Sequence, residues 1–145
     1  MNILICEQMK RFNLLSSEIT AAYHEATFKL GLSDSTMLIL YTTYCNNGEC
    51  LLSDITFMSG ASKQTINSAL RKLETEDIVY LKSFEGRKKK VCLTEKGRQL
   101  ADNTASKLIQ IENEIFDSWS DEKTNLYIEL TEQYLAAFKE KIKEL

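Results

Sequence analysis

Two short stretches of this sequence carry side chains that could bind a polyanion. The first covers residues 62–75, where a helical wheel separates an apolar face from a polar one. The apolar face holds Ile66, Ala69, Leu70 and Leu73. The polar face holds Gln64, Ser68, Arg71 and Thr75, with Asn67 and Lys72 at its flanks. Such side chains can hydrogen-bond base edges in a DNA major groove, into which an α-helix fits.

The start of the same helix is suited to phosphate. Ser62, Lys63 and Thr65 lie there, where free backbone N–H groups and the helix dipole favour an anion. An ordinary solvent-exposed helix would show the same polar face, so this stretch alone leaves both interpretations open.

The second stretch is a run of four cations, Arg87, Lys88, Lys89 and Lys90, directly after Gly86. Their mutual repulsion is unfavourable unless a polyanion lies nearby. We expect Arg87 to enter a minor groove, whose negative potential attracts arginine, and Lys88 and Lys90 to meet phosphates. A solvated loop explains the charge equally well, and it is the neighbouring elements that favour DNA.

Charge is unevenly distributed along the chain. The formal net charge is −3, which argues against a general nucleic-acid binder. Between Lys63 and Arg98, however, ten basic and five acidic residues give +5, so the remainder carries −8. This asymmetry indicates one anion-facing segment on an acidic body.

The elements around these stretches predict a helix-turn-helix followed by a hairpin. Ser53 is expected to cap a helix over 54–58, and a turn over 59–61 leads to the helix that Ser62 caps. The β-branched and aromatic run 78–81 and the apolar run 91–93 predict two strands, with Gly86 at positive φ in the turn between them. A basic hairpin directly after a helix-turn-helix is what favours DNA binding.

Amphipathic helices flank this lobe. We expect one helix over 7–30 and a second from a cap at Ser33 to the stop at residues 46–48. One long helix should run from a Thr94 cap to Trp119, and a last helix should follow Ser120. The predicted fold class is mainly α with a small β-hairpin wing, in one domain of 145 residues. Residues 33–97 are expected to form a winged helix-turn-helix lobe. Residues 1–32 and 98–145 are expected to form a helical dimerisation region. The apolar stripes exceed what a small core covers, which favours a homodimer over an intramolecular bundle.

Two motifs resemble those of the MarR (multiple antibiotic resistance regulator) family. The stretch Ser62–Glu74 resembles its recognition helix, and Arg87–Gly97 resembles its wing with the following Leu-Thr-Glu-Lys-Gly. The order of elements is similar over nearly the whole chain. The resemblance implies a homodimer that binds a palindromic operator in double-stranded DNA, usually as a repressor. Family wings commonly carry Asp-x-Arg where this chain has Glu85-Gly86-Arg87, and this wing is short.

The resemblance also implies a response to a small ligand or to thiol oxidation. The candidate ligand pocket is Tyr23, His24, Phe28, Met37, Tyr41 and Tyr44. Aromatic side chains at helical spacing also occur in ordinary cores, and His24 could be a satisfied, partly buried imidazole. Cys92 should face outward on its strand, because Val91 and Leu93 face inward. A thiol-based redox sensor is therefore one alternative function.

Other function classes find less support. No apolar run approaches the ~18 residues that span a bilayer, and Ile3–Cys6 is too short for a secretory signal, so we expect a cytoplasmic protein without membrane contact. The four cysteines lack C-x-x-C spacing, and His24 is the single histidine, so we expect no metal and no cofactor. No paired carboxylates or nucleophile–base set indicate an enzyme. A winged helix that binds protein instead of DNA is the main alternative.

Overall fold

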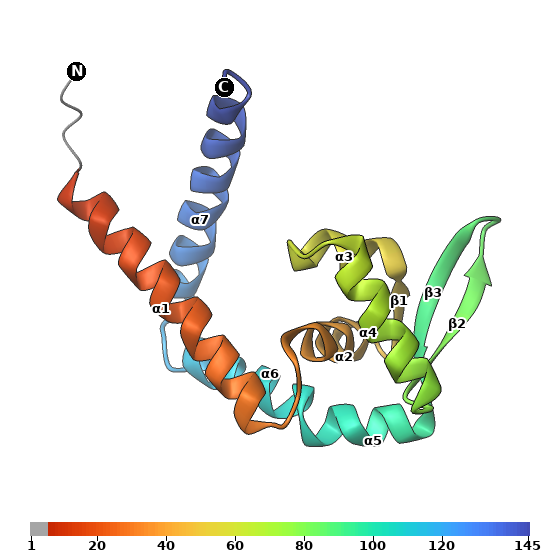
Figure 1. Ribbon diagram of the computed structural model, residues 1–145. Coiled ribbons are helices and arrows are strands. Elements are labelled where there is room, and N and C mark those ends of the chain that lie inside the picture. Colours follow the sequence, from red (N-terminus) through yellow and green to blue (C-terminus); the bar gives the residue numbers. More distant parts are fainter. Residues whose placement is uncertain (1–5) are drawn as a thin grey trace. The chain divides into compact units, whose positions relative to one another are not determined.

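The computed structural model describes residues 6–145, and residues 3–5 of the short N-terminal apolar run lie outside this range. Seven helices and three strands follow one another along it (Figure 1). In order they are α1 (Glu7–Lys29), α2 (Asp34–Cys45), β1 (Glu49–Leu51), α3 (Leu52–Ser59), α4 (Lys63–Thr75), β2 (Val79–Phe84), β3 (Lys88–Leu93), α5 (Glu95–Asn103), α6 (Ala105–Asp117) and α7 (Asp121–Ile142). The chain forms two compact units, one up to Leu108 and one from Ile109 to Leu145.

Polar caps fix the start of four helices. Ser33, Ser62, Thr94 and Ser120 each accept a hydrogen bond from the backbone N–H three residues further on. This satisfies one of the N–H groups that a helix leaves free at its start. The predicted cap at Ser53 is wrong, because α3 begins at Leu52, two residues earlier than predicted, and its N-cap Leu51 makes no side-chain hydrogen bond.

The sheet has three antiparallel strands in the order β1-β3-β2. The predicted hairpin is present, with Val79 opposite Leu93 and Phe84 opposite Lys88. Strand β1 adds a third member, with Glu49 opposite Cys92. Strand β3 is therefore central, although the sequence predicted two strands only.

The core of the first unit lies between this sheet and helices α2–α5, around the fully buried Ile39, Ile55, Ile66 and Val91.

The predicted helix from Thr94 to Trp119 is interrupted at Thr104. Its backbone leaves the helical region, with φ −131° and ψ −82°, and α5 ends there while α6 begins at Ala105. The buried Thr104 hydroxyl donates to the Leu100 carbonyl at 2.7 Å. A threonine that bonds back to the carbonyl four residues earlier competes with the helix ladder and bends it. Ala105 and Leu108 then enter the core of the first unit.

The second unit consists of the end of α6 and α7. Three aromatic rings, Phe116, Trp119 and Tyr127, cluster where the chain turns, with centroids 5.3–6.2 Å apart. Along α7 the apolar stripe remains about half exposed, for example 54% at Leu130 and 52% at Phe138. In the first unit, α1 shows the same property, with Ile19 51% exposed. No helix within residues 6–145 is both long and apolar enough to cross a bilayer.

Candidate nucleic-acid interface

Helix α4 presents the predicted polar face to solvent. Ile66, Leu70 and Leu73 are buried on its inner face and Ala69 is half-buried. The predicted contact residues are all exposed: Ser62, Lys63, Gln64, Thr65, Asn67, Ser68 and Arg71. The Ser62 hydroxyl lies 2.9 Å from that of Thr65 and accepts from its backbone N–H, so the cap itself is ordered. Helix α3 and the turn at Gly60, which has φ +60°, precede α4, as in a helix-turn-helix.

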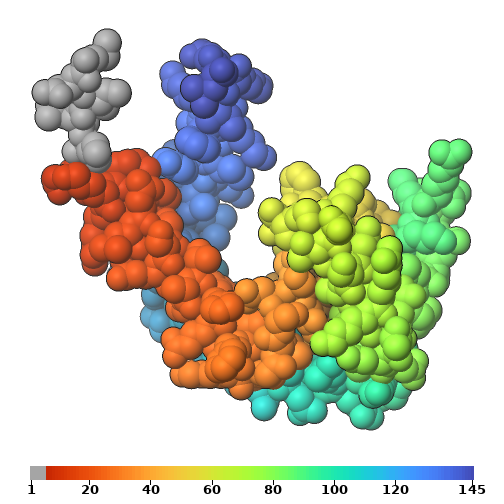
Figure 2. Space-filling model, viewed as in Figure 1, coloured from red at the N-terminus to blue at the C-terminus, as the bar shows by residue number. Residues whose placement is uncertain are grey.

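The wing, defined here as residues 79–93, is the hairpin of β2 and β3. Its tip comprises Glu85, Gly86 and Arg87, and Gly86 has the predicted positive φ, +77°. Glu85 also has positive φ, +44°, and its carboxylate lies 3.6 Å from the Lys88 ammonium. The wing projects from the first unit as a narrow ridge (Figure 2). Arg87 is exposed at its tip, where a minor-groove contact requires it.

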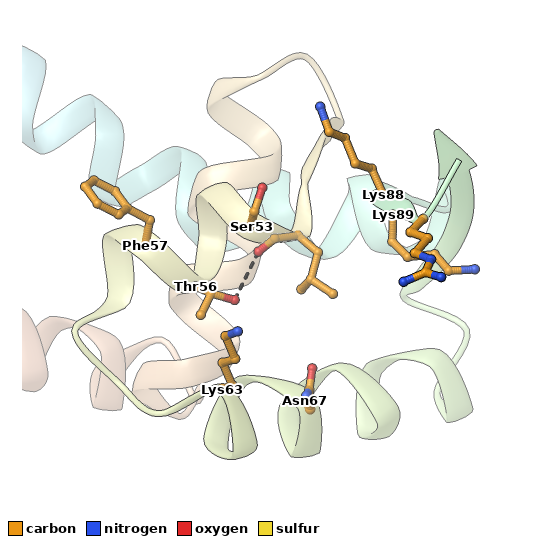
Figure 3. A pocket seen from close by; sticks show the side chains of 9 residues that line it. Ser53, Thr56, Phe57, Lys63, Asn67, Lys88 and Lys89 are labelled. Carbon is orange, nitrogen blue, oxygen red and sulfur yellow. Dashed lines mark hydrogen bonds between the residues drawn. The ribbon is translucent and has the colours of Figure 1, made fainter. Parts of the chain in front are cut away.

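Helix α4 and the wing meet at a hollow of about 500 Å³, called here the cationic hollow (Figure 3). It is lined by Leu52, Ser53, Thr56, Phe57, Lys63, Asn67, Arg87, Lys88 and Lys89. Lys63 and Asn67 point from α4 toward α3, and Lys88 and Lys89 lie across from them on the wing. Four cations and no carboxylate line the hollow, which therefore suits an anion. Gln64, Ser68 and Arg71 lie outside it on the same helix.

Lys90 is placed differently from the other three cations of its run. Its ammonium lies 3.0 Å from the Glu49 carboxylate, which also binds Lys82 at 2.9 Å. The same ammonium lies 4.3 Å from the centre of the Phe84 ring, and its side chain is only 22% exposed. Hydrogen bonds and charge from Lys82 and Lys90 lower the pKa of Glu49 from 4.5 to about 2. Lys90 therefore shares one carboxylate with Lys82 and lies outside the hollow.

Cys92 was expected to face outward and is instead buried, with 2% of its surface exposed. It does point away from Val91 and Leu93, but β1 lies beside β3, and Glu49 covers that face with a carboxylate oxygen 3.7 Å from the sulfur. Cys50 pairs with Val91 and so lies on the opposite face of the sheet, which separates the two thiols. Burial raises the pKa of Cys50 to about 12. Neither buried thiol has the exposure of a redox sensor.

The motif Leu93–Gly97 ties the end of the wing to the end of α4. The Thr94 hydroxyl donates to the Asp77 carbonyl at 2.6 Å and lies 3.1 Å from that of Ile78. The Lys96 ammonium donates at 2.8 Å to the carbonyl of Glu76, the residue that ends α4. A Cβ on Gly97 would collide with the Ile78 carbonyl oxygen. The sequence analysis used this motif for the helix cap at Thr94 and for the family resemblance, and it missed that the motif positions α4.

The six candidate ligand-pocket residues do not line the cationic hollow. Some of them belong to the core or pack against it, and the others are exposed. Met37 belongs to the core, and Tyr41 and Tyr44 pack against it. Phe28 is 76% exposed and Tyr23 43%. The His24 imidazole is exposed and lies 2.8 Å from the Asp34 carboxylate. The ligand pocket stays a prediction. Within residues 6–145 no three histidine, cysteine or acidic side chains gather to hold a metal ion.

Comparison with known proteins identifies the fold. No family model matches the sequence. No curated protein matches it significantly. Among solved structures, NMB1585, a MarR family regulator from Neisseria meningitidis, is similar over 96% of this chain and 99% of its own, with TM-score 0.83 and 18% identity.

Two further structures of similar fold were solved with bound molecules. The S. aureus MepR–DNA complex covers 93% of this chain and 99% of that one, with TM-score 0.66 and 18% identity. NadR in complex with 4-hydroxyphenylacetate covers 92% and 96%, with TM-score 0.70 and 13% identity. The predicted fold class is confirmed: this chain has the winged-helix fold of MarR-family regulators.

Proposed function

We propose that this chain, which has the MarR-family fold, is a sequence-specific DNA-binding transcription regulator. The cationic hollow carries the proposal, because α3, α4 and the wing bring four cations and the Asn67 amide together beside a solvent-facing helix. A DNA duplex supplies the matching surface, with a phosphate on each side of a groove that admits a helix. The MepR–DNA complex supports it, since a protein of this fold binds DNA.

In this proposal α4 lies in a major groove. Gln64, Ser68 and Arg71 read base edges from its exposed face. Ser62, Lys63 and Thr65 hold phosphates at its start, and Asn67 faces the backbone from the hollow. Arg87 enters the adjacent minor groove, and Lys88 and Lys89 bind the phosphates between the two grooves. Lys90 contributes less than the sequence predicted, since Glu49 neutralises it.

The dimer is part of the proposal. The stripes on α1 and α7 leave large apolar side chains half exposed in the single chain, among them Ile19 and Leu130. A second copy would bury them, and a twofold dimer would present two α4 helices to a palindromic operator with half-sites roughly 34–36 Å apart. Occupation of a promoter by such a dimer would repress it. A small-molecule inducer, by analogy with the NadR complex, would act by changing the separation of the two lobes.

A mobility shift against the DNA upstream of the chain's own coding region tests the proposal. We expect binding that weakens steeply with salt, with log affinity linear in log salt concentration. A scrambled duplex of equal length should bind at least about 10³-fold more weakly at physiological salt. Binding that is absent or insensitive to salt would favour the alternative, a winged helix that binds protein.

A further inference from the structure

The structure assigns to Glu49 a role in limiting sequence-independent DNA binding: its one carboxylate binds both Lys82 and Lys90, compensates one of their two positive charges and so keeps these wing cations from phosphate. This inference rests on the proposed function. Glu49 lies on β1, Lys82 on β2 and Lys90 on β3, so one carboxylate spans all three strands. The two ammonium groups lie 2.9 and 3.0 Å from its two oxygens.

The ion triad of Glu49, Lys82 and Lys90 differs from an ordinary surface ion pair. Exposed pairs between neighbouring helical turns contribute little, because two flexible side chains must be ordered for one contact. Here one carboxylate serves two cations, and Lys90 is also held over the Phe84 ring and only 22% exposed. Lys82 lies directly opposite Lys90 in the β-ladder, where two like charges would otherwise repel. The triad therefore holds both cations in place.

The triad is close enough to the cationic hollow to matter for DNA. Lys90 follows Lys88 by two strand residues, which is ~7 Å at the rise of a β-strand. That separation is shorter than the Debye length of roughly 8 Å at physiological salt, so the triad and the hollow share one electrostatic field. Without Glu49 neither Lys82 nor Lys90 would be held by this carboxylate, and the net positive charge of the wing beside the hollow would rise by one. Phosphate contacts bind every sequence alike, so they raise non-specific affinity more than specificity.

Salt dependence measures the number of cations that bind phosphate. Each phosphate neutralised adds about 0.9 to the slope of log affinity against log salt. On a scrambled duplex, Glu49→Gln should lose about 3.5-fold more affinity than wild type between 50 and 200 mM salt if one lysine is released, and about 12-fold more if both are. At low salt both the operator and the scrambled duplex should bind this variant more tightly than wild type, because phosphate contacts bind every sequence alike.

Two further variants separate cation release from the loss of one negative charge. Glu140→Gln removes a carboxylate that pairs with Lys143 at 2.7 Å on α7, and it should leave the slope unchanged. Lys82→Gln alone should also leave the slope unchanged, because that cation is bound to Glu49 and not to phosphate. The double variant that carries both Lys82→Gln and Glu49→Gln has one cation fewer to bind phosphate than Glu49→Gln alone. Its salt slope should therefore be smaller by about 0.9.

The outcomes distinguish this inference from the proposed function. If wild type binds no duplex at all, the proposed function and the inference both fail. If wild type binds its operator while Glu49→Gln keeps the wild-type slope, or weakens both duplexes equally, Glu49 is merely structural and the inference alone fails. Should Glu49→Gln not fold, Lys82→Gln still decides: a slope reduced by about 0.9 would show that Lys82 already binds phosphate, against the inference.

Discussion

Gly97→Ala tests how closely α5 is fixed to the end of α4. Gly97 lies inside α5 at an ordinary helical φ, where alanine would stabilise a free helix by about 1 kcal/mol. In this protein the new Cβ would collide with the Ile78 carbonyl oxygen, far inside the 3.0 Å that real Cβ contacts keep. The neighbour is backbone, so no side chain can rotate away. The helix and Ile78 must separate by about 1 Å.

That separation reaches the hydrogen bonds on which the position of α4 depends. The Thr94 backbone N–H donates to the same Ile78 oxygen at 3.0 Å, and the Thr94 hydroxyl lies 3.1 Å from it. Overpacking of this kind costs about 1–3 kcal/mol, and rigid backbone places the estimate near the upper end. For a chain of this length a loss of about 3 kcal/mol lowers Tm by roughly 10 °C. Operator affinity should fall as well, because Ile78 follows α4 directly.

Calorimetry of Gly97→Ala against Gly31→Ala provides the measurement and its control. Gly31 has φ +76° but nothing within 4 Å of its added Cβ, so its substitution adds backbone strain of about 1 kcal/mol without a collision. We expect Gly97→Ala to lower Tm clearly more than Gly31→Ala. An unchanged or raised Tm for Gly97→Ala would refute the close approach and the positioning role built on it.

Further substitutions test the interface itself. Arg71→Ala should weaken operator binding by about 1–3 kcal/mol and relax specificity at one base pair, which a set of single-base operator variants would reveal. Lys88→Ala should reduce the salt slope on any duplex by about 0.9, and Lys90→Ala should reduce it less, since Glu49 neutralises Lys90. Lys96→Met removes the cation at the end of α4; it should lower operator affinity while the salt slope on scrambled DNA stays constant, and Lys96→Arg should restore the affinity. The pKa of Glu49 is lowered to about 2, so its contribution to the free energy of unfolding is complete above pH 4.5 and is lost as pH falls toward 2. In denaturant titrations, the free energy of unfolding of Glu49→Gln should therefore fall less over this pH range than that of wild type.

Local signals predicted the elements that carry the interface. The four caps at Ser33, Ser62, Thr94 and Ser120 follow from side chains that bond a backbone group three residues away. The two faces of α4 follow from periodicity, and the turn at Gly86 from its conformational freedom. In each case the interaction spans only a few residues, so the sequence displays it directly.

The features that the sequence did not predict depend on residues far apart in the chain. Strand β1 has three residues and exists only by pairing with β3, about forty positions later. That pairing buries Cys92 and places Glu49 beside Lys90, which sequence reasoning had assigned to phosphate. The bond that interrupts the helix at Thr104 spans only four residues, but the burial of that threonine depends on the packing of the core. Hydrophobic periodicity shows where an apolar stripe lies, but it does not predict contacts between residues that are distant in the sequence.

Amide hydrogen exchange of the full chain, alone and with a duplex from its own upstream region, tests the central claim most directly. We expect slower exchange in two separated stretches, the start of α4 from Ser62 and the wing tip around Arg87, and less protection from a scrambled duplex at the same concentration. A duplex that binds while both stretches exchange as in the free protein would contradict it, because the cationic hollow would then not be where DNA lies.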